Sequence, residues 1–314
     1  MDLAYTAAFD MILVTGANGH LGKKLIAALA GTAVRALVRS DTARQDLQRF
    51  IDAENLQQVE IVQLDYLDST AMTAAAESCT YLVHLVGIIK ESHHNSFHIV
   101  HEETTRVLLA ALQQSGVRTI CYLSLLGADG SSSNPCLASR GRAEQLLLAG
   151  DIPALVLRIP MVLGTDDYAS RALYEKANSS FAFTFRGDSL EQPIAADDVV
   201  NAITVDISRP ENDCRERGTI VTLAGPESLS RTALIERAAA ALHKRVRVIS
   251  LPLRLGLVVA WLLEKLSHSP PVSRAMLGVL DHDDQVDPRP ACDQLGIKLT
   301  PLDRILEKTL QEPS

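Results

Sequence analysis

The sequence predicts an α/β fold in which a doubly wound parallel sheet is joined to a smaller, mixed C-terminal lobe. Between residues 11 and 160, short apolar runs of strand length alternate with amphipathic stretches of helical length. The apolar runs are nearly continuous, as expected for strands that helices cover on both faces. After Pro160 this rhythm loosens, and the stretch from Gly164 to Gln192 is polar and irregular.

Six apolar runs are the predicted strands of the parallel sheet: Met11–Thr15, Ala33–Val38, Val59–Leu64, Tyr81–Val86, Thr119–Leu123 and Ala154–Arg158. The clearest helices between them are His98–Gln114 and Leu137–Ala149, with Gly116 and Gly150 as their C-terminal glycines. Further along, helices are expected at Asp197–Ile207 and Ser230–His243, and strands at Thr219–Leu223 and Val246–Ile249. The segments Leu251–Leu266 and Ala291–Leu310 are expected to be additional helical or loop elements.

Composition excludes several classes of protein. The 314 residues carry 30 Lys plus Arg against 38 Asp plus Glu, a net charge of -8 that repels nucleic-acid phosphates. The five cysteines are widely spaced and fit neither a disulfide framework nor a zinc site. No basic leader and no apolar run of about 20 residues occurs. We therefore expect a cytoplasmic protein with no transmembrane segment and no nucleic-acid partner.

A glycine pattern follows the first predicted strand. Gly16, Gly19 and Gly22 form GxxGxxG between this strand and a helix. Gly16 permits a tight turn, Gly19 lets the backbone approach a pyrophosphate, and Gly22 lets the helix pack closely. The helix N-terminus offers unpaired N–H groups to the phosphate charge. The pattern predicts a dinucleotide site; the alternative is a nucleotide fold whose site is empty.

The end of the second strand bears on the choice of cofactor. An acidic residue here would bind the ribose 2′-hydroxyl of NAD, but Arg39 ends the strand and no acid precedes Asp41. Because an arginine can pair with a 2′-phosphate, NADP(H) is favoured over NAD(H). The alternative is that Arg39 is a solvated surface residue.

With its glycine turn, the chain resembles the extended and atypical short-chain dehydrogenase/reductase superfamily, whose members have an NAD(P)-binding Rossmann fold. The other motifs that carry this resemblance are Asp65, Val86-Gly87-Ile88, Arg158–Gly164 and Pro193–Val200. Three stretches, His84–Glu91, Phe97–Thr105 and Leu223–Ser230, resemble the atypical group typified by the nucleotide-binding accessory subunit of respiratory complex I. The resemblance covers the chain from about Met11 to Leu310.

The loosened rhythm after Pro160 predicts a domain division, and the resemblance implies a set of cofactor residues. Residues 1–164 would form the dinucleotide-binding domain, its sheet completed by 191–224, and residues 165–190 and 225–314 a smaller lobe for substrate or partner. The pyrophosphate would lie against Gly16, Asn18, Gly19, His20, Leu21 and Gly22. Arg39 would meet the adenosine ribose, and Asp65 and Tyr66 the adenine edge. Val86, Gly87, Ile88 and Arg140 would hold the second ribose, with Pro160 and Val162 near the nicotinamide.

The catalytic residues of the superfamily are altered here. Active members transfer a proton with a Tyr-x-x-x-Lys pair on the helix after strand five, and Cys136 and Arg140 occupy these two positions. A cysteine is too short to replace the tyrosine, and an arginine keeps its charge but moves no proton. Ser124 keeps the strand-end serine, and Lys90 is a further acid candidate beside Tyr168 and Tyr174. No catalytic residue is assigned.

Three other patterns allow more than one interpretation. Arg140 and a helix N-terminus would lower the pKa of the Cys136 thiol, so this cysteine is either an activated thiolate or a small space-filling residue. His93, His94, His98 and His101 have helical metal-ligand spacing, but no carboxylate or cysteine completes a set, so no metal is predicted. The segment Leu255–Leu263 is interpreted as a packed helix of the second lobe rather than one that rests on a membrane or partner.

Three functions remain open. The first is an NADP(H)-binding reductase of a quinone or enone-like molecule, in which hydride transfer suffices and the proton comes from water or substrate. The second is a non-catalytic nucleotide-binding module with a structural, assembly or redox-sensing role, whose second lobe docks a protein partner. The third is a sugar-nucleotide epimerase or dehydratase, against which the missing Tyr/Lys pair counts directly.

Overall fold

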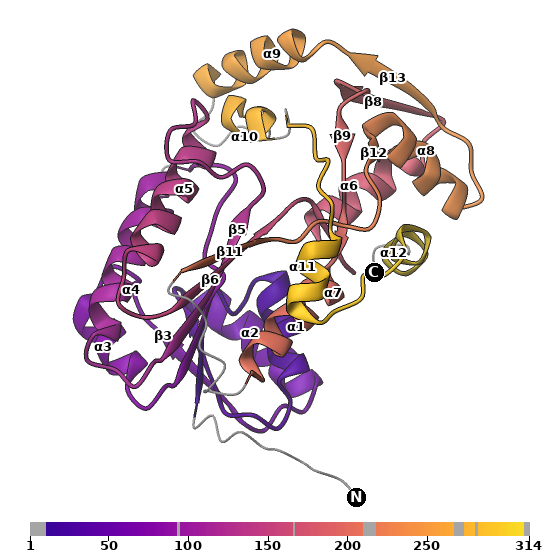
Figure 1. Ribbon diagram of the computed structural model, residues 1–314. Coiled ribbons are helices and arrows are strands. Elements are labelled where there is room, and N and C mark those ends of the chain that lie inside the picture. The colour runs from indigo at the N-terminus through magenta and orange to yellow at the C-terminus, as the bar shows by residue number, and fades with distance from the viewer. Residues whose placement is uncertain are drawn as a thin grey trace, which may run out of the picture.

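The computed structural model describes residues 11–92, 95–165, 167–209, 218–266, 273–279 and 282–310. A seven-stranded parallel sheet with the order β11-β6-β5-β4-β1-β2-β3 forms its centre (Figure 1). Its strands are β1 (Ile12–Thr15), β2 (Val34–Val38), β3 (Val59–Gln63), β4 (Tyr81–His84), β5 (Thr119–Leu125), β6 (Ala154–Ile159) and β11 (Thr219–Thr222). The predicted doubly wound α/β fold is confirmed.

Helices cover both faces of this sheet because successive side chains of each strand point to opposite sides. Leu13 of β1 belongs to the core beneath three helices, α3 (Ser69–Ala76), α4 (Thr104–Leu112) and α5 (Pro135–Leu148). Ile12 and Val14 belong to the opposite core, beneath α1 (His20–Ala28), α2 (Asp41–Ala53), α7 (Ala196–Ile207) and α11 (Arg289–Leu295). Since α11 packs in this core, that part of the segment 225–314 lies with the main sheet.

A third apolar core holds the smaller lobe together. Its helices are α6 (Tyr168–Ala177), α8 (Arg231–Ala241) and α12 (Leu302–Thr309). The small two-stranded sheets are β7 (Val162–Leu163) with β10 (Ile194–Ala195), β9 (Leu190–Glu191) with β12 (Leu229–Ser230), and β8 (Phe181–Phe185) with β13 (Arg247–Leu251). Two further helices, α9 (Leu253–Leu266) and α10 (Arg274–Val279), lie at the top of Figure 1.

Two details of the helices differ from expectation. The predicted helix His98–Gln114 begins as a π-helix, η1 (His98–Glu103), and its α-helical part ends at Leu112. Gly116 and Gly150 are not left-handed helix ends, since the caps of α4 and α5 are Gln113 and Ala149 in right-handed conformations. Side-chain periodicity locates a helix but does not reveal a widened turn or the handedness of its last residue.

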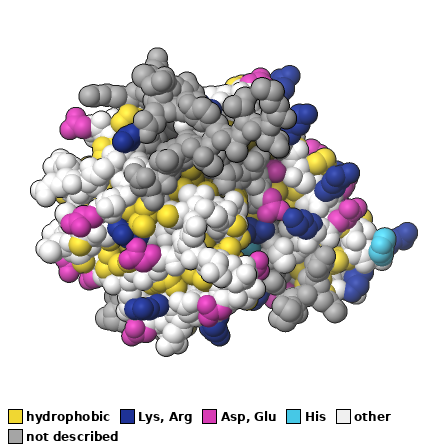
Figure 2. Space-filling view, turned by 90° about the horizontal axis from the view of Figure 1, so that it is seen from below, with side chains coloured by type: hydrophobic (Ala, Val, Ile, Leu, Met, Phe, Trp, Pro, Cys, Tyr) yellow, Lys and Arg dark blue, Asp and Glu magenta, His cyan; other side chains and the backbone are white. Residues whose placement is uncertain are grey.

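The surface seen from below carries charges of both signs. Lys and Arg side chains are interspersed with Asp and Glu over this face, and neither sign dominates it (Figure 2). Among the described residues of this face, the Lys and Arg side chains form no continuous basic stripe of the kind that binds nucleic acid. Within the described ranges, every helix is too short or too polar to cross a membrane.

Candidate functional site

Gly16 and Gly22 make the turn after β1 possible. Gly16 has a φ of 70°, and a Cβ there would lie 3.2 Å from the Leu85 carbonyl carbon and the Val86 nitrogen. A Cβ on Gly22 would lie 2.6 Å from the carbonyl oxygen of Ala17. The missing side chains therefore let α1 and the end of β4 approach the turn.

The N-terminus of α1 is left open. Five other helices begin with a side chain that accepts a hydrogen bond from the first turn, namely Ser40, Asp68, Asn134, Asp167 and Ser230. Gly19 precedes α1 and provides no such cap. Because the first-turn N–H groups have no capping side chain, they can bind an anion, and a dinucleotide pyrophosphate fits this turn.

Tyr66 holds the glycine turn through two hydrogen bonds of its side-chain hydroxyl. The backbone N–H of Gly16 donates to the Tyr66 hydroxyl at 3.0 Å, and this hydroxyl donates to the Leu37 carbonyl oxygen at 2.8 Å. Burial of the side chain raises the pKa of Tyr66 to about 12, so the hydroxyl stays protonated. Tyr66, which the resemblance assigned to the adenine edge, thus directs its hydroxyl to the phosphate turn.

Asp65 and Arg39 lie exposed at the neighbouring strand ends. The Asp65 carboxylate accepts a hydrogen bond from the Leu67 backbone N–H at 3.0 Å. The Arg39 guanidinium donates to the Asn95 side-chain oxygen at 2.6 Å. Both side chains are accessible to a ligand that extends from the turn toward β2 and β3.

His20, the first residue of α1, connects the turn to the segment after β6. A Cβ on Gly164 would lie 2.4 Å from His20 Nε2, so the imidazole rests where this glycine has no side chain. Among the remaining predicted residues of this region, Asn18 and Leu21 are half-buried in the turn and in α1, Pro160 is buried, and Val162 is half-buried in β7. The segment Pro160–Gly164 therefore lies beside the start of α1.

Arg140, which the resemblance assigns to the lysine position of the superfamily pair, is only 6% exposed. Its Nη1 donates to the carbonyl oxygens of Val86 and Leu123 at 3.2 and 3.1 Å, and to the Tyr122 hydroxyl at 2.8 Å. A Cβ on Gly87 would lie 1.5 Å from Arg140 Nη2. Gly87 is therefore the residue that makes room for the guanidinium, and Arg140 is a fixed positive charge between the ends of β4 and β5.

Two buried histidines surround this charge. His84 Nδ1 lies 2.6 Å from the Thr15 hydroxyl, and His101 Nε2 lies 3.1 Å from both backbone N and O of Ile88. Burial and then the Arg140 charge lower the pKa of His84 to about 3 and that of His101 to about 2. Both rings are neutral at physiological pH. Sequence reasoning assigned His84 no role, although a histidine ending an otherwise apolar strand was the available signal.

Cys136, which the resemblance assigns to the tyrosine position, is a buried thiol. It is the second residue of α5, and its S–H donates to the Ile88 carbonyl oxygen at 3.6 Å. Burial raises the pKa of Cys136 to about 11, outweighing the opposite effect of Arg140. The interpretation as an activated thiolate is therefore wrong, because sequence reasoning counted the nearby charge and the helix N-terminus but not the burial.

Unpaired polar atoms gather beside these residues. Within the described ranges, the buried Ser124 Oγ, Arg140 Nε and His101 Nδ1 have no hydrogen-bond partner. Buried polar atoms are costly unless something satisfies them, so this edge suits a ligand rich in hydroxyl groups, such as a ribose. Lys90 is half-buried in the loop after β4.

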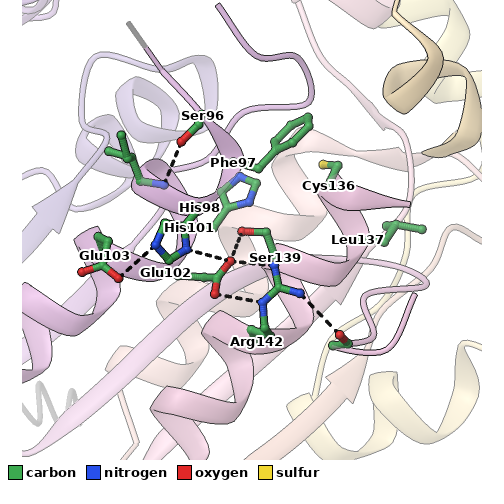
Figure 3. A network of polar contacts seen from close by, with 12 residues as sticks. Ser96, Phe97, His98, His101, Glu102, Glu103, Cys136, Leu137, Ser139 and Arg142 are labelled. Carbon is green, nitrogen blue, oxygen red and sulfur yellow. Dashed lines mark hydrogen bonds and ion pairs between the residues drawn. The ribbon is translucent and has the colours of Figure 1, made fainter. Parts of the chain in front are cut away.

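The π-helix η1 is held against α5 by a network around Glu102 (Figure 3). Glu102 accepts hydrogen bonds from Ser139 at 2.8 Å and from two nitrogens of Arg142, each at 2.8 Å. Burial raises the pKa of Glu102, but the hydrogen bonds from Arg142, Ser139 and His98 lower this pKa by more. The pKa of Glu102 is therefore about 2. The network fixes the helix that carries His101.

The predicted absence of a metal site remains a prediction. His98 contacts the carboxylates of Glu102 and Glu103, each at 3.3 Å, and His101 contacts the backbone of Ile88. His93 and His94 lie outside the described residues. Within the described ranges, no three His, Cys, Asp or Glu side chains form a group able to hold an ion.

Comparisons with known proteins agree with this geometry. A family model described as NAD(P)H-binding matches residues 16–205. A ceramide reductase from Caulobacter vibrioides is 31% identical over 180 residues, which are 56% of this chain and 53% of the relative. The mitochondrial NADH dehydrogenase (ubiquinone) 1 alpha subcomplex subunit 9 of Arabidopsis thaliana is 24% identical over 250 residues, 79% of this chain and 61% of the relative.

The chain thus spans between half and two thirds of the length of these curated relatives. Among solved structures, UDP-glucuronic acid 4-epimerase from Bacillus cereus, in complex with UDP-glucuronic acid and NAD, has a TM-score of 0.72 and 18% identity. The match covers 96% of this chain and 98% of the epimerase, and at this identity it shows the fold alone. The family match and the glycine turn together show that the chain belongs to the NAD(P)H-binding, Rossmann-fold family of atypical short-chain dehydrogenase/reductase proteins.

Proposed function

We propose that this protein is an NADPH-dependent reductase that transfers hydride to a quinone or enone-like acceptor and takes the accompanying proton from water. One observation carries the proposal. The turn for the cofactor pyrophosphate keeps its three glycines and its open helix N-terminus, whereas a buried thiol with a pKa of about 11 occupies the position of the proton donor. The similarity to a protein named ceramide reductase supports reduction as the type of reaction.

Each group of residues has a separate task in this proposal. NADPH, when bound, would supply a hydride, and the acceptor would take up this hydride and one proton from water, so that a quinone would leave as the hydroquinone. The α1 N-terminus and Gly19 hold the pyrophosphate. Ser124 and Arg140 face the ribose end, where the fixed guanidinium charge stabilises negative charge that develops on the acceptor oxygen.

The acceptor class follows from the missing acid. Reduction of a simple ketone produces an alkoxide, a strong base that needs a proton donor beside it during the reaction. Reduction of a quinone or enone spreads the new negative charge over a conjugated system, so the oxygen is a much weaker base and water suffices. Below about pH 11 the Cys136 thiol keeps its proton and donates its hydrogen bond to Ile88. This state of the thiol is compatible with reduction of a quinone or enone, for which water supplies the proton.

The preference for NADPH rests on Arg39. Its exposed guanidinium lies at the end of β2, near the place where an adenosine ribose would follow from the glycine turn. We expect Arg39→Ala to weaken NADPH binding about tenfold and to leave NADH binding nearly unchanged, because the lost contact is an ion pair with the 2′-phosphate. Arg49→Ala, at an exposed arginine of α2, is the control and should change neither affinity.

A second candidate is a nucleotide-binding module without catalysis. The buried state of both Cys136 and Arg140 favours it, since neither residue is arranged to move a proton. The Arabidopsis relative bears the name of a subunit of a larger assembly, which is compatible with such a role. In this alternative the nucleotide stabilises the fold or reports redox state, and the smaller lobe contacts a protein partner.

Stopped-flow oxidation of bound NADPH distinguishes the two candidates. The protein is loaded with NADPH and mixed with a panel of quinones, enones and simple ketones. The reductase proposal expects turnover with members of the first two classes and none with the ketones. Tight NADPH binding without turnover of any acceptor would overturn it in favour of the non-catalytic module.

A further inference from the structure

The helix α9 presents its bulky apolar residues to solvent. The exposed ones are Leu255, Val258, Val259, Trp261, Leu262 and Leu266. With the 100° rotation of an α-helix per residue, these side chains share an arc of about 160°. The interpretation of this segment as an ordinary packed helix is therefore wrong for this face.

Small residues attach α9 to the rest of the lobe. Gly256 and Ala260 are its buried residues, and a Cβ on Gly256 would lie 3.0 Å from the Phe185 ring. A surface helix normally buries its large apolar side chains, whereas α9 exposes them and packs through small residues. We define the α9 surface as the six exposed residues of this helix.

The charges on the exposed arc are positive. Arg254 and Lys265 are exposed near the two ends of α9, and Lys265 Nζ lies 5.2 Å from the centre of the Trp261 ring. Glu264, the acidic residue of this helix, points elsewhere and pairs with Arg274 at 2.7 Å. Two cations thus border an apolar surface on a chain whose net charge is -8.

We propose that the α9 surface binds peripherally to a lipid bilayer that contains anionic lipids, with α9 lying in the plane of the membrane. Apolar side chains enter the headgroup boundary, while the tryptophan and the lysine and arginine stems remain at the interface. Anionic headgroups complement Arg254 and Lys265. A second copy of this chain is a poorer occupant, because it would bring Arg254 and Lys265 against the same two cations of its partner.

Docking would bring the candidate site close to the bilayer. The helix α10 packs against both α9 and α5, and the Asn134 side-chain amide donates to the Ala275 carbonyl oxygen at 2.8 Å. Asn134 also caps the helix turn that contains Cys136. If the proposed reductase function holds, on which this step alone rests, its acceptor would be a lipid-soluble molecule taken from the membrane.

Trp261 is the single tryptophan of the chain, so its fluorescence reports directly on this surface. The full-length protein is titrated with vesicles of phosphatidylcholine alone and of phosphatidylcholine mixed with phosphatidylglycerol. We expect a blue shift and co-sedimentation with the mixed vesicles, both weakened by salt because the headgroup attraction is screened. Leu262→Glu should weaken this binding at least about tenfold.

Ile220→Glu is the matched control, because Ile220 is a similarly exposed apolar residue on β11, outside the α9 surface. It should bind the mixed vesicles like the unchanged protein. Thermal unfolding and NADPH binding of both variants, measured without lipid, show that the fold is intact and test the nucleotide site separately. Absence of a blue shift and of co-sedimentation with either vesicle would overturn the proposal. A blue shift that depends on protein concentration in the absence of lipid would also overturn it, since a second copy then covers the surface.

Discussion

The N-termini of α1 and α5 both contribute to the candidate site, yet they are built in opposite ways. The first follows Gly19 and has no capping side chain, so its N–H groups are available to a phosphate. The second is capped by the Asn134 side chain, which accepts from the N–H groups of Cys136 and Leu137, and it begins with a proline. One helix start is open to a ligand, and the other is satisfied within the protein.

This difference indicates that cofactor binding and proton transfer depend on different residues of the sequence. The glycine turn depends on missing side chains, and each of its three glycines is present. Proton transfer depends on one side chain that reaches the acceptor, and Cys136 is instead buried against the Ile88 carbonyl oxygen. A chain of this family can therefore keep the turn that binds the cofactor and lack the side chain that donates the proton. Water can then supply the proton instead.

The largest effect is expected at the open helix. Gly22→Ala places a Cβ 2.6 Å from the Ala17 carbonyl oxygen, which should displace α1, lower the free energy of unfolding by about 3 kcal/mol and weaken NADPH binding more than tenfold. Chemical denaturation and fluorescence titration measure the two effects. Gly150→Ala is the control, because its nearest atom lies at 3.3 Å, and it should change both quantities little. Equal effects of the two changes would contradict the close-packing explanation.

Next in size is the contact between Gly87 and Arg140. Gly87→Ala should cost about 2 kcal/mol of stability, because the new Cβ collides with the guanidinium. In an Arg140→Ala background the same change should cost almost nothing, since the colliding atoms are gone. A double-mutant cycle by urea denaturation measures this coupling. Additive costs would show that Gly87 is required for another reason.

A smaller, pH-dependent effect is expected from His84. Its folded pKa of about 3 lies below the unfolded value near 6.5, so the unfolded chain binds more protons in acid. Its contribution to stability is complete above about pH 6.5 and is lost as the pH falls, by about 1.4 kcal/mol per pH unit. His84→Gln should remove this part of the pH dependence, while His101, whose pKa is about 2, keeps its own part. Denaturation curves between pH 7 and pH 5 compare the two proteins, with identical slopes as the contradicting result.

The smallest effect is expected at Cys136. Because its thiol keeps its proton until about pH 11, Cys136→Ala should change the rate of the proposed quinone reduction less than about twofold and add no step to the pH profile between pH 6 and pH 9. Steady-state kinetics across this range test the expectation. A large loss of kcat would identify the thiol as the proton donor.

Sequence reasoning succeeded where the signal is local. The strands of the main sheet and the glycine turn follow from apolar runs and from the positions of three glycines. It left two interpretations of Cys136 open, because the pKa of the thiol depends on contacts with the loop after β4. It failed for the π-helical start of the helix at His98. It also misjudged α9, because an apolar helical pattern does not specify which face the neighbouring segments leave uncovered.

The two hydrogen bonds of the Tyr66 hydroxyl have a consequence for how a nucleotide would bind. They join the turn at Gly16 to the Leu37 carbonyl oxygen of β2 through atoms of the protein alone. The conformational entropy of the turn is therefore lost when the chain folds and not when the nucleotide arrives. The pyrophosphate meets a rigid receptor, so association is expected to proceed in one step, without a slow rearrangement of the loop.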